Sequence, residues 1–136
     1  MKKILKLASE LDTKWQNIGC FPDADLSQYN KSTGIYKLRI DDEIVYIGQA
    51  KEAANGGLRK RLRDFERRSK SARDYAAGEQ INKKSRHIAI EILIIDDVEY
   101  INELKKYFIA EYNPSWNRIF KSSETNDYWK YFRTKR

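Results

Sequence analysis

The amino-acid sequence predicts a small α+β domain in which a three-stranded antiparallel sheet is flanked by helices. Two short runs rich in β-branched and aromatic residues, 34–40 and 44–48, are joined by Asp41-Asp42-Glu43. Such a short polar connection is typical of a tight antiparallel hairpin. A third apolar run, residues 87–95, predicts a buried strand. Apolar residues at helical spacing around these runs predict the flanking helices.

The helices are predicted from apolar residues that recur every three or four positions. In the segment after the hairpin, Leu58, Leu62 and Phe65 fall on one face of a basic helix. We therefore expect, in chain order, a helix over 2–11, a loop over 12–33, the basic helix over about 58–70, a short helix and a loop within 71–86, and a last helix over about 98–112 that ends at Asn113-Pro114.

Length and composition indicate one intracellular domain. A chain of 136 residues leaves little room for a second domain, so we expect a single domain over 1–136. We expect its core over 34–117, a helix and loop over 1–33, and a basic, aromatic tail over 118–136. Apolar runs fall short of the roughly 20 residues of a membrane span, and residues 1–7 are too short for a secretory signal. A cytoplasmic protein that does not enter the membrane is therefore expected.

The scarcity of cysteine and histidine excludes several kinds of site. The chain has one cysteine, Cys20, and one histidine, His87. One cysteine cannot form an internal disulfide, and the two residues together cannot build a zinc site of the Cys/His type. A Ser-His-Asp triad would need His87, and no nucleophile-elbow motif accompanies it. We interpret His87 as structural or incidental.

The positive charge is concentrated in two segments. With 27 Lys+Arg against 20 Asp+Glu, the formal net charge is +7, which favours nucleic acid as a partner. Residues 59–73 hold eight basic and two acidic residues, and residues 118–136 hold six and two. Such clustering suits a surface that follows a phosphate backbone, although solvated helical faces give the same pattern. The candidate phosphate contacts are Lys60, Arg63, Arg67, Arg68, Lys130 and Arg133.

Two tripeptides on the hairpin carry the most specific signal. Gly34-Ile35-Tyr36 and Tyr46-Ile47-Gly48 are separated by nine residues, and a helix that contains Arg61 follows them. The helix after the third strand then leads into Asn113-Pro114-Ser115-Trp116-Asn117. In this order the motifs resemble the GIY-YIG nuclease family, and the resemblance covers about residues 34–117.

The resemblance implies a DNA endonuclease that hydrolyses phosphodiester bonds with one divalent cation, Mg²⁺, held by a single glutamate. It implies that Tyr36 and Tyr46 line the site and position the attacking water. The glycines Gly34 and Gly48 would shape the backbone around them, because a residue without Cβ permits close approach.

Two further residues receive roles from the same resemblance. Arg61 would hold the scissile phosphate and offset the charge that develops in the transition state. Asn117 would brace the site by hydrogen bonding. Phe65 stands where relatives often carry histidine or tyrosine, and we expect it to pack in the core.

The sequence departs from the family at the metal-binding position. The resemblance places the glutamate twelve residues before Asn117, where this chain has Lys105. At about 100° per residue, Lys105 lies roughly 40° from Ile101, inside the apolar face, whereas Glu103 lies roughly 200° away and is a poor substitute. A primary ammonium repels Mg²⁺, so no intact metal position is left on this helix. Lys105 either snorkels to the surface or, as we expect, enters a polar cavity and contacts phosphate.

Three explanations for Lys105 stay open. The first is that the chain is an inactivated variant of an active nuclease. The second is that it is a natural non-catalytic nucleic-acid-binding protein. The third is that it is an enzyme in which an irregular turn of the helix brings a different acid to the site. An RNA-binding basic domain would leave the ordered motifs unexplained.

The short chain favours a compact endonuclease of the restriction type or the small phage type, which recognises double-stranded DNA through the nuclease domain itself. With one active site per chain, cutting both strands requires a homodimer or two sequential nicks. We expect a homodimer or a higher homo-oligomer on DNA.

Overall fold

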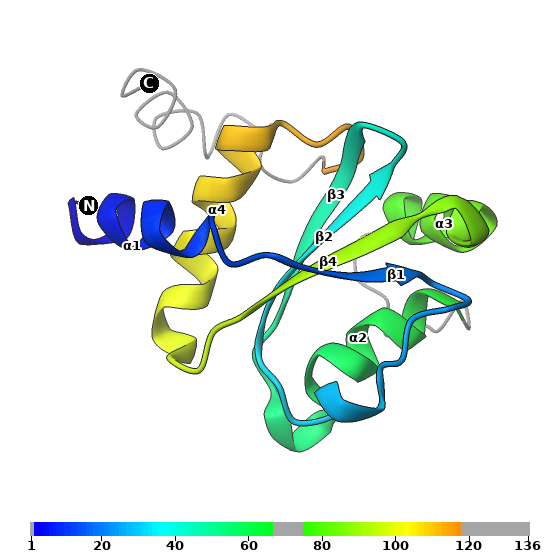
Figure 1. The fold of residues 1–136 in the computed structure, drawn as a ribbon, viewed down its shortest axis with the longest axis horizontal. Coiled ribbons are helices and arrows are strands. Elements are labelled where there is room, and N and C mark those ends of the chain that lie inside the picture. The colour runs from blue at the N-terminus through cyan, green and yellow to red at the C-terminus, as the bar shows by residue number, and fades with distance from the viewer. Residues whose placement is uncertain (1, 67–74, 118–136) are drawn as a thin grey trace.

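A central antiparallel sheet lies between two pairs of helices (Figure 1). The computed structural model describes residues 2–66 and 75–117, and these residues form four strands, so the α+β class is confirmed and one strand is added to the three expected. The elements are α1 Lys2–Leu11, β1 Gln16–Cys20, β2 Gly34–Ile40, β3 Glu43–Ala50, α2 Gly57–Glu66, α3 Tyr75–Lys84, β4 Ala89–Ile94 and α4 Ile101–Tyr112, with short 3-10 turns at Ser27–Tyr29, Ala53–Asn55, Ser85–His87 and Val98–Tyr100.

The strand order is β1-β4-β2-β3, and each neighbouring pair is antiparallel. The expected hairpin is confirmed: β2 and β3 pair from Gly34 opposite Ala50 to Ile40 opposite Glu43, across a two-residue turn. Asp41 in that turn has a φ of 53°, a left-handed conformation that aspartate tolerates better than most residues. The β3 strand is an edge of the sheet among the described strands, which leaves one side of its backbone open to other partners.

The fourth strand, β1, corrects the expectation of a loop over 12–33. It consists of Gln16-Asn17-Ile18-Gly19-Cys20, a run with a single β-branched residue, and its pairing with β4 is irregular between Asn17 and Gly19. Gly19 has a φ of 93°, which explains the glycine there. The strand forms because β4 offers a free edge, a tertiary effect that local propensity does not report.

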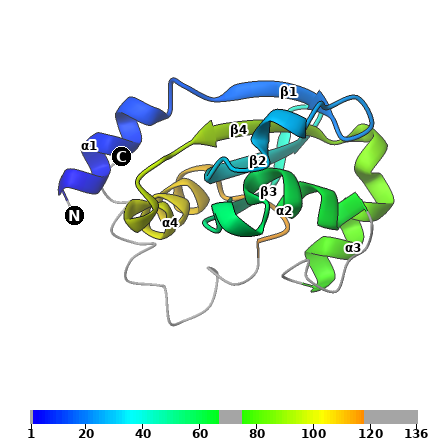
Figure 2. The same ribbon diagram turned by 90° about the horizontal axis from the view of Figure 1, so that it is seen from below.

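Each face of the sheet buries its own hydrophobic cluster, because successive side chains of a strand point to opposite faces. On one face, Tyr36, Leu38 and Tyr46 pack with residues of α2 and α3. On the other face, Ile35 and Ile47 pack with residues of α1 and α4. Figures 1 and 2 show the two helix pairs on opposite sides of the sheet. The two faces of the sheet therefore carry separate sets of side chains.

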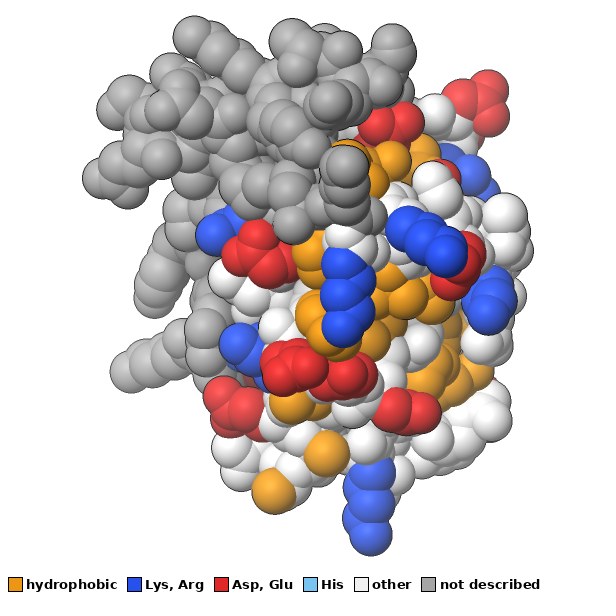
Figure 3. All heavy atoms as spheres, turned by 90° about the vertical axis from the view of Figure 1, so that its left-hand side faces the viewer, with side chains coloured by type: hydrophobic (Ala, Val, Ile, Leu, Met, Phe, Trp, Pro, Cys, Tyr) orange, Lys and Arg blue, Asp and Glu red, His pale blue; other side chains and the backbone are white. Residues whose placement is uncertain are grey.

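The side of the molecule that carries α1 and α4 presents a band of hydrophobic side chains between scattered charged ones (Figure 3). Leu5, Leu7 and Leu11 of α1 are among the partly buried hydrophobic residues packed on this side. In the described part of the chain, no helix has the length and apolar character needed to cross a membrane.

A buried lysine joins the segment that follows α1, the sheet and α4 on this face. The ammonium of Lys37 in β2 lies 4.2 Å from the ring centroid of Trp15 and 4.3 Å from that of Tyr112, which are cation–π distances. It also pairs with Glu91 of β4 at 3.7 Å. The indole N–H of Trp15 and the phenol of Tyr112 both donate to Asp12, at 2.8 and 2.6 Å. These contacts join four segments that are distant in sequence.

Burial shifts the proton equilibria in this cluster. It lowers the pKa of Lys37 below its ordinary value, while the charge of Glu91 opposes the shift. Burial also raises the pKa of Tyr112 well above its ordinary value, and the hydrogen bond to Asp12 adds to the shift. The folded protein therefore keeps Tyr112 protonated at a pH where the unfolded chain ionises it.

Replacement of Tyr112 with Phe should lower the free energy of unfolding by about 1–2 kcal/mol at pH 7, because a hydrogen bond to a carboxylate is lost. The stabilising effect of Tyr112 is complete below its unfolded pKa of about 10 and declines as the pH rises above it, because only the unfolded state releases the proton. Urea denaturation at pH 8 to 11 should show the gap between wild type and variant narrowing as the pH rises. A gap that stays constant would contradict this account.

Candidate active site

Two tyrosines and one phenylalanine form a buried aromatic cluster beneath α2. Tyr36 of β2 and Tyr46 of β3 lie on the same face of the sheet, with ring centroids 6.2 Å apart. Phe65 of α2 meets each of them edge-on at a centroid distance of 6.0 Å. The exposed fractions of the three residues are 3%, 7% and 2%, so packing fixes their positions. The expected role of Phe65 in the core is confirmed. We call these three residues the tyrosine cluster.

Gly48 makes room for the phenol of Tyr36. The two residues face each other across the hairpin, and a Cβ atom at position 48 would overlap the Tyr36 ring carbons and hydroxyl. Glycine is required at position 34 for a different reason, because a Cβ atom there would overlap the backbone carbonyl of Leu93 on β4. Both glycines of the two tripeptides are therefore required by close approach.

Asn117 binds the open edge of β3 between Tyr46 and Gly48. Its Oδ1 accepts the backbone N–H of Ile47 and its Nδ2 donates to the Ile47 carbonyl, each at 2.8 Å. The backbone N–H of Trp116 adds a bond of 2.8 Å to the carbonyl of Val45. Asn117 is 5% exposed, so these bonds are shielded from water. The segment that ends the described chain thus holds the strand that carries Tyr46.

The α2 helix projects Arg61 beside the tyrosine cluster. Phe65 contacts both tyrosines and lies one turn after Arg61, and residues four apart share a side of a helix. Leu58 and Leu62 are fully buried and fix the helix on the sheet. The expected helix over 58–70 is observed over Gly57–Glu66, and the residues that follow lie outside the described part of the chain.

The chain enters α2 through a glycine pair. Gly56 and Gly57 have φ angles of 102° and 55°, both in the left-handed region that favours glycine. A Cβ at Gly57 would also overlap the carbonyl of Ser32, so the turn packs directly against that segment.

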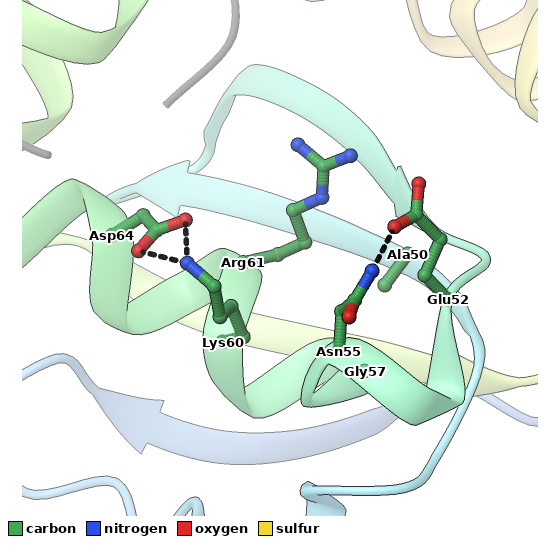
Figure 4. A pocket seen from close by; sticks show the side chains of 7 residues that line it. All are labelled: Ala50, Glu52, Asn55, Gly57, Lys60, Arg61 and Asp64. Carbon is green, nitrogen blue, oxygen red and sulfur yellow. Dashed lines mark hydrogen bonds and ion pairs between the residues drawn. The ribbon is translucent and has the colours of Figure 1, made fainter. Parts of the chain in front are cut away.

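Arg61 lines a pocket of about 240 Å³ and forms no ion pair with a described carboxylate. Figure 4 shows it between the Lys60–Asp64 pair and the Glu52–Asn55 pair. Lys60 binds both oxygens of Asp64, at 3.1 and 3.2 Å, and Glu52 accepts a bond of 2.6 Å from Asn55. Among the described residues, no carboxylate forms an ion pair with Arg61. The lining of this pocket, hereafter the Arg61 pocket, is Ala50, Glu52, Asn55, Gly57, Lys60, Arg61 and Asp64.

The charges around Arg61 show why it is suited to an external anion. Its neighbour Arg63 is paired with Glu66 at 3.0 Å, and Lys60 is paired with the buried Asp64. A guanidinium presents five N–H donors in a planar fork that matches a phosphate, and here it is the pocket cation that lacks an internal carboxylate among the described residues.

Lys105 lies on α4, whose buried residues include Ile101, Leu104, Phe108 and Ile109. The side chain of Lys105 is half-buried and is not part of the lining of the Arg61 pocket. Glu103 pairs with Lys106 at 3.7 Å and remains 40% exposed, in agreement with its expected position away from the apolar face. Two carboxylates line the pocket: Glu52 lies in the loop after β3, and Asp64 lies on α2.

The structure brings part of the expected site together. Tyr36 and Tyr46 pack together under Phe65 of α2, and Asn117 binds β3 next to Tyr46. Arg61 lies one helical turn before Phe65, but neither tyrosine is part of the lining of the Arg61 pocket. Sequence analysis missed the acidic and amide residues of the pocket; the spacing of Lys60 and Asp64 was the available signal for one of them. The candidate phosphate contacts Arg67, Arg68, Lys130 and Arg133 lie outside the described residues.

Replacement of Gly48 with Ala should destabilise the protein by about 1–3 kcal/mol, because the new methyl group displaces the Tyr36 ring. Urea denaturation and near-ultraviolet circular dichroism would report the loss of stability and of aromatic packing. The matched control is the same change in a Tyr36→Leu background, where the ring is absent and the cost should fall. An equal cost in both backgrounds would contradict the contact between Gly48 and Tyr36.

Comparison with known proteins supports the arrangement at the level of the fold. No family model and no curated protein sequence matches the chain. Among solved structures, the chain is similar to the GIY-YIG N-terminal endonuclease domain of UvrC from Thermotoga maritima, bound to its catalytic divalent cation, magnesium. The identity is 19%, the TM-score is 0.50, and the match covers 66% of this chain and 88% of that domain. A point mutant of the same domain, also bound to its catalytic divalent cation, matches with 20% identity, a TM-score of 0.50, and coverage of 66% and 87%. The chain therefore has the fold of the GIY-YIG nuclease domains.

Proposed function

We propose that this chain binds DNA as an endonuclease of the GIY-YIG type, with the scissile phosphodiester held by Arg61. The observation that carries the proposal is the guanidinium of Arg61, which lines a pocket beside the tyrosine cluster without an ion-pair partner among the described residues. The similar domains are GIY-YIG endonuclease domains bound to a catalytic divalent cation, and this likeness of fold supports the proposal. We propose restriction-type or phage-type action on double-stranded DNA.

Each residue of the proposed site has a physical role. Arg61 would donate two parallel hydrogen bonds to the non-bridging oxygens and offset the negative charge that grows as water attacks phosphorus. Tyr46 would orient the attacking water. Tyr36, whose ring centroid lies 6.2 Å from that of Tyr46, would help to position the same water. Asn117 would act at a distance, because it holds the backbone of Ile47 and thereby the position of Tyr46.

The residues present do not fit a resident Mg²⁺. Lys105 stands at the position implied for the single glutamate, and its ammonium repels a cation. The carboxylates of the Arg61 pocket are engaged, Glu52 with Asn55 and Asp64 with Lys60. Residues 2–66 and 75–117 contain no group of three or more His, Cys, Asp or Glu side chains that could hold a metal ion, so no multi-ligand site replaces the single glutamate there. We therefore propose that the chain binds the phosphodiester and is impaired in hydrolysis.

The same observations favour a second candidate function, a nucleic-acid-binding protein without catalysis. Binding needs the cations of α2 and the shape of the pocket, and both are independent of position 105. The two functions predict different effects of a glutamate at position 105: it should restore cleavage in an inactivated endonuclease and should not produce cleavage in a binding protein. With one site per chain, an active form would cut both strands as a homodimer or by two successive nicks.

Replacement of Lys105 with Glu should give Mg²⁺-dependent cleavage of supercoiled plasmid, whereas the wild-type chain should leave the plasmid intact. The physical reason is that a carboxylate supplies the ligand that an ammonium cannot. Gel electrophoresis of plasmid over a range of Mg²⁺ and Mn²⁺ concentrations measures the result. Nicked circles that precede linear DNA would indicate successive cuts.

Lys106→Glu is the matched control for this experiment, because it makes the same charge change at the next residue, which pairs with Glu103. It should not produce cleavage. If the folded Lys105→Glu variant leaves the plasmid intact at every metal concentration, the endonuclease is excluded and the binding protein is supported. Cleavage by the wild-type chain would contradict the proposed impairment.

Replacement of Arg61 with Ala should weaken binding of a 20-base-pair duplex and reduce the slope of log K against log salt concentration by about 0.9, the value for one phosphate contact. In the Lys105→Glu background it should slow cleavage by about 10²–10³-fold, as expected for the loss of one transition-state donor. Arg63→Ala is the control, since Arg63 is paired with Glu66. Equal effects of the two substitutions on cleavage would contradict the role of Arg61.

A further inference from the structure

A second concave surface lies next to the Arg61 pocket and has a different charge. It is a groove of about 400 Å³ lined by Asn30, Lys31, Ala53, Ala54, Gly56 and Arg59, hereafter the Lys31 groove. Its lining contains two cations and no acid. The Arg61 pocket, by contrast, has two cations and two carboxylates in its lining. The groove is therefore the more attractive of the two surfaces for a polyanion.

The two surfaces lie on opposite sides of the same turn. Gly56 lines the groove and Gly57 lines the pocket, while Arg59 lines the groove and Arg61 the pocket. Residues two apart on a helix point about 200° from each other, so Arg59 and Arg61 project from opposite sides of the first turn of α2. The separation of the two surfaces is therefore on the order of one helix diameter, about 10 Å.

The backbone that carries the cations of the groove is docked on α2, and these cations form no ion pair with a described carboxylate. The carbonyl of Ser32 accepts the backbone N–H of Leu58 at 2.9 Å, and Tyr29 is buried, so the segment that bears Lys31 is docked on α2. Lys31 and Arg59 are exposed, and within the described residues neither forms an ion pair. Hydrogen bonds from Ser27 are the main cause of the lowered pKa of Asp25, and the charge of Arg59 is the smallest of its causes.

We infer that the Lys31 groove binds the phosphate backbone of the DNA strand that flanks the phosphodiester at Arg61. The inference rests on the proposed function and gives the groove and the Arg61 pocket different roles in DNA binding. The groove, with its uncompensated charge, supplies salt-sensitive affinity, and the Arg61 pocket, with balanced charge, positions one phosphodiester. The small side chains Ala53, Ala54 and Gly56 leave the space for a sugar-phosphate chain between the two cations.

Fluorescence anisotropy with a labelled 20-base-pair duplex, at 50 to 300 mM KCl, tests the inference. The double variant Lys31→Gln and Arg59→Gln should bind more weakly than wild type at every salt concentration. The slope of log K against log salt concentration should become shallower by about 1.8, because two phosphate contacts are lost at about 0.9 each. Both side chains are exposed, so the melting temperature should remain that of the wild type.

The matched control removes two charges elsewhere, with Lys6→Gln and Lys14→Gln, both exposed residues in or next to α1. This control should keep the wild-type slope; an equal loss of slope would overturn the inference. If wild type binds the duplex and the groove variant keeps its slope, the groove is excluded while the proposed function stands. If wild type fails to bind any duplex, the proposed function fails first. Tighter binding of the RNA duplex of the same sequence would overturn the assignment to DNA.

Discussion

The amide of Asn117 on the open edge of β3 is the interaction on which the site depends. An edge strand has unpaired backbone groups, and this side chain satisfies the N–H and the carbonyl of Ile47 together. The bond fixes the backbone between Tyr46, whose ring faces α2, and Gly48, which gives the Tyr36 phenol its space. Because Ile47 points to the opposite core, the same residue couples the site to the packing of α1 and α4.

Ion pairs within the protein determine which cations of α2 are available to bind an external anion. In the described part of α2, Lys60 and Arg63 each have a carboxylate partner on the same helix, and Arg61 between them has none. Internal pairs leave little attraction for an outside anion, so a +7 chain can still present few strong phosphate sites. Net charge indicates the kind of partner, and the pattern of pairing indicates where that partner binds.

The fold could largely be predicted because its signals are local. The β-branched and aromatic residues of β2 and β3, the short acidic turn and the apolar face of Leu58, Leu62 and Phe65 are each recognisable within a few residues of sequence. The β1 strand could not be predicted from the sequence, because it forms only by pairing with the edge of β4. The two tripeptides and the helix after them predicted Tyr36, Tyr46 and Arg61 as site residues. The pocket residues Glu52 and Asn55 were not predicted, because they lie on a loop whose path the sequence does not reveal. The Lys37 cluster joins segments too far apart for any pattern.

In the proposed function, the pocket beside the tyrosine cluster receives a phosphodiester through Arg61. A crystal structure of the chain with a short DNA duplex tests it most directly. The account predicts one phosphodiester with its oxygens about 2.7–2.9 Å from the Arg61 guanidinium, the distance of a charge-assisted hydrogen bond, close to Tyr46. A duplex bound to another face, with Arg61 surrounded by solvent, would contradict it.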